Sequence, residues 1–226
     1  MPRHVTLIIP AFNEAECIGQ VLAEVPPGVI EEVIVVDNGS VDGTGEIARS
    51  SGATVVHEPR RGYGFACAAG AAAAKCDRLV FMDGDGSFDP GELTRLVAPL
   101  ERNEAELSLG SRMLTKLPPG AMPAHQIFGN RLISWMLSRL YDARLTDLGP
   151  FRALSRELLF SLDMQERTYG WPVEMVVKVA RQRLRIIEVP VSYRPRLAGR
   201  SKVGGSLQGT FKATYHILRV FFRYGF

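Results

Sequence analysis

The chain has 226 residues, of which 46% are hydrophobic, 23% are charged and 8% are aromatic, and its formal net charge is +3 at pH 7. This length and composition allow one sizeable hydrophobic core in a single domain. So small a net charge gives no support for a nucleic-acid partner, and no stretch reaches the ~20 apolar residues that a membrane-spanning helix needs.

Cysteine usage and the start of the chain bear on where the protein works. Cys17, Cys67 and Cys76 have neither an even count nor the paired spacing of a metal site, so we expect reduced thiols. The apolar run that ends at Pro10 is too short for the hydrophobic part of a signal peptide. We therefore expect a cytoplasmic protein.

The first half of the chain alternates short apolar runs with stretches of helical character. Strands are predicted at residues 5–10, 32–37, 54–57, 78–83 and 105–110. Helices are predicted at residues 14–25, from residue 42 to 51, at 63–74 and at 90–101. We expect Asn13 and Asp42 to cap the first two helices. The alternation predicts a mostly parallel sheet flanked by helices.

The second half changes character. A proline-rich loop at residues 117–123 precedes an amphipathic helix at 126–141, and a further helix and strand are predicted at 172–182 and 185–191. We interpret residues 1–112 as a nucleotide-binding half and residues 113–226 as an acceptor-binding half of one α/β domain.

Two carboxylates directly follow a predicted strand. Asp83-Gly84-Asp85-Gly86 comes after the apolar residues 79–82, and open α/β sheets bind ligands at the carboxyl ends of their strands. The glycines let a ligand approach the backbone, and the acids are hard oxygen ligands for a divalent cation. Two carboxylates facing a diphosphate would repel it without Mg²⁺ or Mn²⁺ between them. A solvated turn is the simpler alternative.

Ordered motifs resemble a known family. Four follow predicted strands, at Pro10-Ala11-Phe12-Asn13-Glu14, Val36-Asp37-Asn38-Gly39-Ser40-Val41-Asp42-Gly43-Thr44, Asp83-Gly84-Asp85-Gly86 and Gly110-Ser111-Arg112. Three more lie at residues 147–152, 169–174 and 196–202. Together they resemble the family 2 inverting glycosyltransferases of GT-A fold, and within them the dolichyl- or polyprenyl-phosphate sugar synthases.

The resemblance implies a fold and an activity. The fold would be a single GT-A domain with a Rossmann-like, mostly parallel sheet. The activity would be metal-dependent, inverting transfer of a hexose from a nucleoside diphosphate sugar. The implied acceptor is a polyprenyl phosphate, dolichyl or undecaprenyl, at the cytoplasmic face of the membrane.

The resemblance also implies site residues. The nucleotide contacts would be Pro10, Phe12, Glu14 and Asp37, while Asp83, Gly84 and Asp85 would face the phosphates, with both aspartates on the metal.

Three cations fit the charge that develops on the leaving diphosphate. Arg112, Arg196 and Lys202 would stabilise it from fixed positions, and arginine can do so through two parallel hydrogen bonds. Arg112 is therefore predicted to be catalytic as well as substrate-binding.

Asp147 is the candidate base. A hydroxyl acceptor needs a carboxylate to take its proton, whereas a phosphate acceptor is already anionic, and Asp147 would then position groups or balance Arg152. For Asp147 and Glu174 a structural salt bridge is the alternative.

Two positions depart from the family pattern. Asn38 stands where a second aspartate is usual, and Ser87 stands where lipid-phosphate sugar synthases often carry glutamine. These departures leave open what Asn38 contributes to nucleotide choice and whether Ser87 contacts the metal. They also support the alternative of a non-catalytic nucleotide-sugar-binding or scaffold protein. A transferase acting on a soluble or lipid hydroxyl acceptor is a separate alternative.

The segment of residues 207–226 mixes aromatic and aliphatic residues with Lys212, Arg219 and Arg223. A basic amphipathic helix of this kind is suited to an anionic membrane surface. The alternatives are a final helix packed on the sheet or in an oligomer interface.

Overall fold

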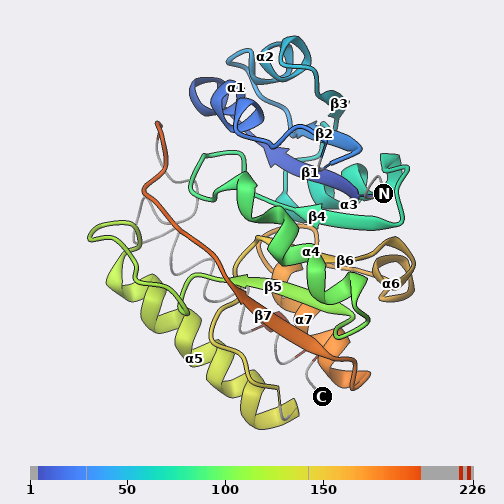
Figure 1. The fold of residues 1–226 in the computed structure, drawn as a ribbon, viewed down its shortest axis with the longest axis vertical. Helices are drawn as coiled ribbons and strands as arrows, with labels where there is room; N and C mark the ends of the chain where they lie inside the picture. Colours follow the sequence, from blue (N-terminus) through green and yellow to red (C-terminus); the bar gives the residue numbers. More distant parts are fainter. Residues whose placement is uncertain (1–4, 29, 142, 200–218, 221–222, 225–226) are drawn as a thin grey trace.

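A seven-stranded sheet organises the part of the chain that the structure describes (Figure 1). The structure is a computed structural model, and it describes residues 5–28, 30–141, 143–199, 219–220 and 223–224. The strands are β1 (Val5–Ala11), β2 (Glu32–Asp37), β3 (Thr54–His57), β4 (Arg78–Phe81), β5 (Leu107–Ser111), β6 (Arg152–Ser155) and β7 (Ile186–Pro190). Their order across the sheet is β3-β2-β1-β4-β6-β5-β7.

The sheet is mostly parallel, as predicted. β3, β2, β1 and β4 pair in parallel, and β5 pairs in parallel with β7. The predicted set of strands is incomplete, because β6 was not predicted from the sequence. It lies between β4 and β5 and runs antiparallel to both. The motif at residues 147–152 therefore lies at the start of a central strand, beside the loop that follows β4.

Helices cover both faces of the sheet. They are α1 (Ala15–Ala23), α2 (Thr44–Ser50), α3 (Tyr63–Ala73), α4 (Leu93–Glu101), α5 (Ala124–Tyr141), α6 (Arg156–Ser161) and α7 (Trp171–Arg181), and the 3-10 turn η1 (Pro90–Glu92) precedes α4. Six of these helices lie where the sequence predicts them. α6 was not predicted.

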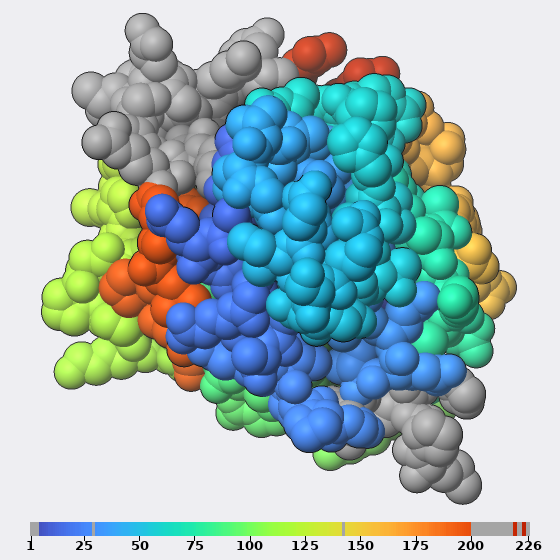
Figure 2. Space-filling model, turned by 90° about the horizontal axis from the view of Figure 1, so that it is seen from above, coloured from blue at the N-terminus to red at the C-terminus, as the bar shows by residue number. Residues whose placement is uncertain are grey.

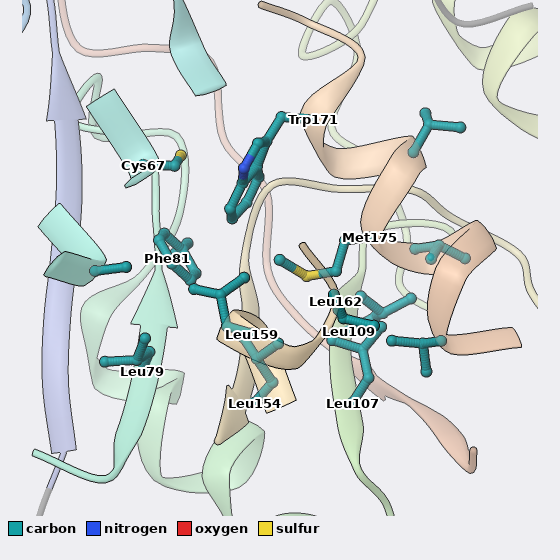
Figure 3. Close-up of a cluster of buried hydrophobic side chains, with 14 of the residues drawn as sticks. Cys67, Leu79, Phe81, Leu107, Leu109, Leu154, Leu159, Leu162, Trp171 and Met175 are labelled. Atoms are coloured by element: carbon teal, nitrogen blue, oxygen red, sulfur yellow. The ribbon is translucent and has the colours of Figure 1, made fainter. Parts of the chain in front are cut away.

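Alternating strand residues feed two cores. Ile8 of β1 packs with residues of α3, α5, α6 and α7 on one face, while Leu7 and Ile9 pack with α1, α2 and α4 on the other. Figure 3 shows the first core, where Trp171 of α7 lies edge-on to Phe81 of β4 with ring centroids 5.0 Å apart. Both faces of the sheet are thus covered, which explains why β1, β2 and β4 carry continuous apolar runs rather than alternating ones.

The predicted caps act differently from expectation. Asn13 does not cap α1; its backbone has φ 51° and its side-chain oxygen accepts from the backbone N–H of Val41 at 3.0 Å. Asp42 accepts from the N–H of Ala15 at 3.1 Å and from the N–H of Thr44 at 3.1 Å. Asp42 therefore ties the first turn of α1 to the approach to α2, which holds the loops after β1 and β2 together.

The C-terminal segment lies largely outside the described residues. Of the four that are described, Val220 is fully buried and packs, with Tyr224, against the core that contains α7. That contact fits the alternative of a final helix packed on the domain. The predicted membrane-surface role of residues 207–226 is not tested by it. Within the described residues, no helix is long and apolar enough to cross a bilayer.

Candidate active site

A cavity of about 730 Å³ opens at the carboxyl ends of the central strands. Residues that follow β1, β2, β4 and β5 line it on one side, and α5 and the start of α7 line it on the other. Of the residues singled out in the sequence, the lining includes Pro10, Phe12, Glu14, Asp83, Gly84, Asp85, Arg112 and Arg196. Open α/β sheets bind ligands in this position.

Asp83 has an unusual electrostatic environment. Burial, together with the nearby negative charges of Asp85 and Glu14, raises the pKa of the Asp83 carboxyl from 3.8 to about 7, although Arg112 and Arg152 act in the opposite direction. A carboxylate that is costly to ionise gains from a bound cation. Its environment therefore fits a metal ligand.

Ser87 orients Asp85. The Ser87 hydroxyl donates to Oδ1 of Asp85 at 2.6 Å, and the Ser87 N–H donates to the same oxygen at 3.0 Å. Ser87 is 2% exposed. The hydroxyl thus fixes one carboxylate oxygen of Asp85, a residue that lines the cavity.

The donor set suits a hard divalent cation. No group of three or more His, Cys, Asp or Glu side chains that could hold a metal occurs among the described residues. Asp83 and Asp85 would provide two oxygens, and Mg²⁺ or Mn²⁺ bound through two carboxylates takes its remaining ligands from water and substrate phosphates. The pair therefore fits a metal that binds together with a diphosphate.

The two glycines of this motif are required sterically. A Cβ on Gly84 would lie 2.9 Å from Cγ2 of Ile9, and a Cβ on Gly86, where φ is +75°, would lie 2.4 Å from Cδ1 of Leu197. The missing Cβ of Gly84 lets the aspartate loop pack closely against Ile9 of β1. The missing Cβ of Gly86 lets Leu197, from the segment that follows β7, pack on the loop.

Residues 193–199 form a strap over the aspartate loop. The N–H of Leu197 donates to the carbonyl of Asp85 at 3.0 Å, and the N–H of Arg194 donates to that of Ser87 at 2.9 Å. In Figure 2 the orange-to-red segment lies between blue N-terminal residues and yellow-green α5. The two hydrogen bonds thus fix the strap to the loop that carries the aspartates.

Arg196 of the strap and Glu14 form an ion pair at the cavity wall. One Nη of Arg196 lies 2.8 and 2.7 Å from the two carboxylate oxygens of Glu14, and the other lies 3.8 Å from Oδ2 of Asp85. The structure brings together two residues that are 182 positions apart. A cation is thereby fixed next to the aspartate pair, as the charge on a leaving diphosphate would require.

Arg112 is held by Asp147. Nε and Nη2 of Arg112 donate to the two oxygens of Asp147, each at 2.7 Å, and the Arg112 N–H donates at 2.8 Å. Burial would raise the pKa of Asp147, but the hydrogen bonds and charge of Arg112 outweigh it and lower that pKa. Asp147 pairs with Arg112 and not with Arg152, which donates to the carbonyls of Pro172, Leu148 and Gly149.

Asp147 is fully buried and is absent from the cavity lining, so its placement fits the positioning role better than that of a base. Glu188 supports it from β7, because its carboxylate accepts from the N–H groups of Thr146 and Asp147 at 2.8 Å each. Glu174 is also structural. It is fully buried, it lies 2.7 Å from Nζ of Lys178, and it accepts from the N–H groups of Gln165 and Glu166.

Asn38 organises the loop before α3. Its amide nitrogen donates to the carbonyls of Glu58 at 2.8 Å and Arg60 at 2.7 Å, and its oxygen accepts from the N–H of Gly62 at 2.9 Å. This loop carries Arg61, whose guanidinium lies 3.3 Å from the centre of the Phe12 ring. An aspartate would lack the two donors. The departure from the family pattern thus has a structural explanation.

Asp37 does not line the cavity. Its Oδ1 accepts from the Ser40 N–H at 2.8 Å, and its nucleotide contact stays a prediction. Lys202 lies outside the described residues.

A sequence model described as Glycosyl transferase family 2 matches residues 6–160. The chain belongs to glycosyl transferase family 2. This confirms the family expected from the motifs, and the protein is a glycosyltransferase.

Several relatives of this glycosyltransferase align with it over most of the length of both chains. An uncharacterized glycosyltransferase of Mycobacterium tuberculosis is 39% identical over 218 residues, covering 96% of this chain and 97% of that protein. The undecaprenyl-phosphate mannosyltransferase of Micrococcus luteus is 34% identical over 223 residues, covering 91% and 89%. The dolichyl-phosphate hexose transferase of Haloferax volcanii is 34% identical over 202 residues, covering 87% and 85%.

Solved structures confirm the GT-A fold. Glucosyl-3-phosphoglycerate synthase from Mycobacterium tuberculosis, crystallised with UDP, superposes with a TM-score of 0.80 at 27% identity, covering 99% of this chain and 80% of that one. The same enzyme with Mn²⁺, UDP-glucose and glycerol 3-phosphate gives a TM-score of 0.78 at 26% identity, again covering 99% and 80%.

The sequence did not single out three residues that line the cavity of this glycosyltransferase. They are Arg61, His125 of α5 and Tyr193 of the strap, whose ring lies 5.1 Å from the guanidinium carbon of Arg112. Arg61 and Tyr193 are single residues in loops that carry no recognisable pattern. His125 lies in the first turn of α5, and in the sequence it cannot be told from a histidine on the protein surface.

Proposed function

We propose that this glycosyltransferase moves a hexose, with inversion and with Mg²⁺ or Mn²⁺, from a nucleoside diphosphate sugar to a polyprenyl phosphate. The observation that carries the proposal is the convergence of the Asp83 and Asp85 pair with two held arginines, Arg112 and Arg196, on one cavity.

The donor end of the cavity would bind the nucleotide diphosphate. A bound cation would neutralise charge on the diphosphate as it leaves. Arg196, paired with Glu14, and Arg112, held by Asp147, are already oriented, so stabilising that charge needs little reorganisation. Pro10 and Phe12 line the cavity beside Arg61, where a nucleoside would meet an aromatic ring and a cation.

A hydroxyl acceptor would need a base in the cavity, whereas a phosphate acceptor would not. Among the described residues, the carboxylates that line the cavity are Glu14, Asp83 and Asp85. The first is paired with Arg196, and the other two form the proposed metal site. None is placed for taking a proton from a hydroxyl, whereas a phosphate oxygen attacks as an anion. Relatives named for undecaprenyl-phosphate and dolichyl-phosphate transfer support this choice.

The wall formed by α5 and α7 is apolar at several positions. Ile133 of α5 and Val173 of α7 line it, and Met122 and Leu148 line the cavity from loops outside these helices. Such a wall suits the first units of a prenyl chain, because apolar contact removes hydrocarbon from water. The proposed workplace is the cytoplasmic face of the cell membrane, reached by peripheral association.

A small phosphorylated acceptor is the second candidate. It is favoured by the structural similarity to glucosyl-3-phosphoglycerate synthase, which was crystallised with phosphoglyceric acid. Both candidates use an anionic acceptor and the same donor end. They differ in what touches the wall formed by α5 and α7.

The test is a transfer assay over a panel of donors and acceptors. UDP- and GDP-hexoses are offered with Mn²⁺ to a short polyprenyl phosphate, to 3-phosphoglycerate and to a polyprenol. We expect transfer to the prenyl phosphate, its loss in Asp85→Asn, and its retention in Asp89→Asn, since Asp89 is exposed and accepts from the Gly91 N–H. Transfer to 3-phosphoglycerate alone would show that the acceptor is a small phosphorylated molecule and not a polyprenyl phosphate. Metal-independent donor binding without any transfer would leave a non-catalytic binding protein.

A further inference from the structure

We propose that the outward face of α5 docks on an anionic lipid bilayer. The role of this contact in catalysis rests on the proposed function, because a polyprenyl phosphate is presented at a membrane surface. The contact itself is a property of the helix.

The outward face carries large apolar side chains in water. Phe128 is 70% exposed, Trp135 is 60% exposed and Leu132 is 41% exposed. Their spacing of four and three residues places them along one face of the helix. The opposite face already supplies the core with Ile133 and Leu137, which are 4% and 0% exposed. The fold therefore does not need the exposed stripe for packing.

The charges on α5 and on the loop that precedes it are of one sign. Residues 107–141 contain no Asp or Glu, and Lys116, Arg131 and Arg139 in this region are exposed. Aromatic and aliphatic residues flanked by cations are the composition of helices that lie in the headgroup region of anionic membranes. A symmetric contact between two copies of this face would instead bring like charges together. The charge thus favours lipid over a second copy.

The position of α5 links the stripe to the active site. Gln126, Asn130 and Ile133 on its inner side line the cavity, so a single helix separates the cavity from the exposed stripe. In Figure 2 yellow-green α5 forms an edge of the molecule. Lying on a bilayer, the helix would bring the cavity close to the depth at which lipid phosphates lie.

The chain contains its own probe for this contact. It has two tryptophans; Trp135 is exposed, whereas Trp171 is 1% exposed within the core. Purified protein is titrated with vesicles of equal parts phosphatidylglycerol and phosphatidylcholine, and with vesicles of phosphatidylcholine alone. We expect a blue shift of emission, and quenching by brominated acyl chains, with the anionic vesicles. Both signals, recorded with excitation selective for tryptophan, should be lost in Trp135→Phe, which leaves Trp171 as the only tryptophan.

Vesicle flotation tests the stripe directly. Phe128→Ser should weaken binding at least about tenfold, the loss expected when a large apolar side chain no longer enters the interface. Phe160→Ser is the matched control, because Phe160 is an aromatic residue 51% exposed on α6, and it should bind as the wild type does. Equal binding by Phe128→Ser and wild type, or no binding to anionic vesicles, would overturn the proposal. So would a wild-type dimer that Phe128→Ser converts to a monomer.

Activity assays separate this inference from the proposed function. Phe128→Ser should transfer normally to a short, water-soluble prenyl phosphate and poorly to a long-chain acceptor embedded in vesicles. Vesicle binding without transfer to any prenyl phosphate would refute the proposed acceptor and leave the docking face intact. Transfer to embedded acceptor at the wild-type rate in Phe128→Ser would refute the docking face alone.

Discussion

Both carboxylate oxygens of Asp147 accept hydrogen bonds from the side chain of Arg112, and Asp147 itself is fully buried. Arg112 reaches the cavity while Asp147 does not. The motif at residues 147–152 therefore contributes to the site through an arginine that the chain supplied 35 residues earlier. Asp147 is best described as a positioning residue.

Replacing Asp147 with asparagine tests that description. Asp147→Asn leaves a buried guanidinium without its counter-ion, so we expect a loss of about 3–5 kcal/mol in the free energy of unfolding. Because Arg112 would lose its orientation, kcat should fall about 10²-fold. The pH profile of kcat decides between the roles. A positioning residue leaves its acidic limb in place, whereas removal of a general base abolishes that limb.

His125 provides a complementary test of the acceptor. His125 lines the cavity, and among the described residues it is the histidine in that lining. Its imidazole could take a proton from an acceptor. With a phosphate acceptor no proton has to be removed, so His125→Ala should change kcat by less than about tenfold, below the usual contribution of a general base. A larger fall, confined to hydroxyl acceptors in the assay panel, would indicate base catalysis.

The raised pKa of Asp83 predicts a pH-dependent stability of the metal-free protein. Between pH 3.8 and about pH 7, the folded state keeps a proton on the Asp83 carboxyl that the unfolded chain has lost. The contribution of Asp83 to stability therefore falls as pH rises through this range. Relative to wild type, Asp83→Asn should gain stability between pH 4 and 7.5, as measured by urea unfolding at both values. A difference that is independent of pH would contradict the assigned environment.

Asn38→Asp should damage the loop that carries Arg61. The amide nitrogen that donates to the carbonyls of Glu58 and Arg60 becomes an oxygen, which repels them. Leaving buried acceptors unpaired costs about 1–3 kcal/mol. We expect a loss of that size in the free energy of unfolding and a higher KM for the nucleotide sugar. An improved KM would show that position 38 selects the nucleotide directly, as an aspartate of the usual pattern would.

Two helix glycines should respond in opposite ways to alanine. A Cβ on Gly70 of α3 would lie 2.4 Å from Cγ2 of Ile8 and 2.9 Å from Cγ2 of Val36, whereas a Cβ on Gly129 of α5 would meet nothing within 4 Å. Gly70→Ala should destabilise the protein by about 1–3 kcal/mol. Gly129→Ala should be neutral or stabilise it by up to about 1 kcal/mol. Thermal unfolding of both variants gives the comparison, and similar values would refute the close packing of α3 on the sheet.

The sequence predicted those elements that a local pattern of apolar and polar residues determines. The apolar runs that became β1, β2 and β4 were visible because strands buried on both faces are apolar throughout. Their polar neighbours, such as Asp83 and Glu14, could then be placed at one edge of the sheet. Gly70 gave no such signal, and Gly84 was predicted for the approach of a ligand but not for its close contact with Ile9, because the need for a missing Cβ depends on strands far away in the chain.

Tertiary contacts decided the rest. β6 has four residues, Arg152 to Ser155, and begins with a charged side chain, so no periodicity marks it as a central strand. Arg152 is fully buried there, and its two Nη groups donate to main-chain carbonyls. The pairing of Glu14 with Arg196 joins opposite ends of the chain. Spacing alone could not have predicted either arrangement.

Calorimetric titration of UDP and GDP, with and without Mn²⁺, into wild type and Asp85→Asn tests the central claim most directly. The claim is that Asp83 and Asp85 bind a diphosphate through a divalent cation. One nucleotide should bind wild type at least about tenfold more tightly with Mn²⁺ than without it, and Asp85→Asn should lose that difference while retaining the wild-type melting temperature. Equal affinities in wild type with and without Mn²⁺, or an unchanged Mn²⁺ effect in Asp85→Asn, would contradict the account.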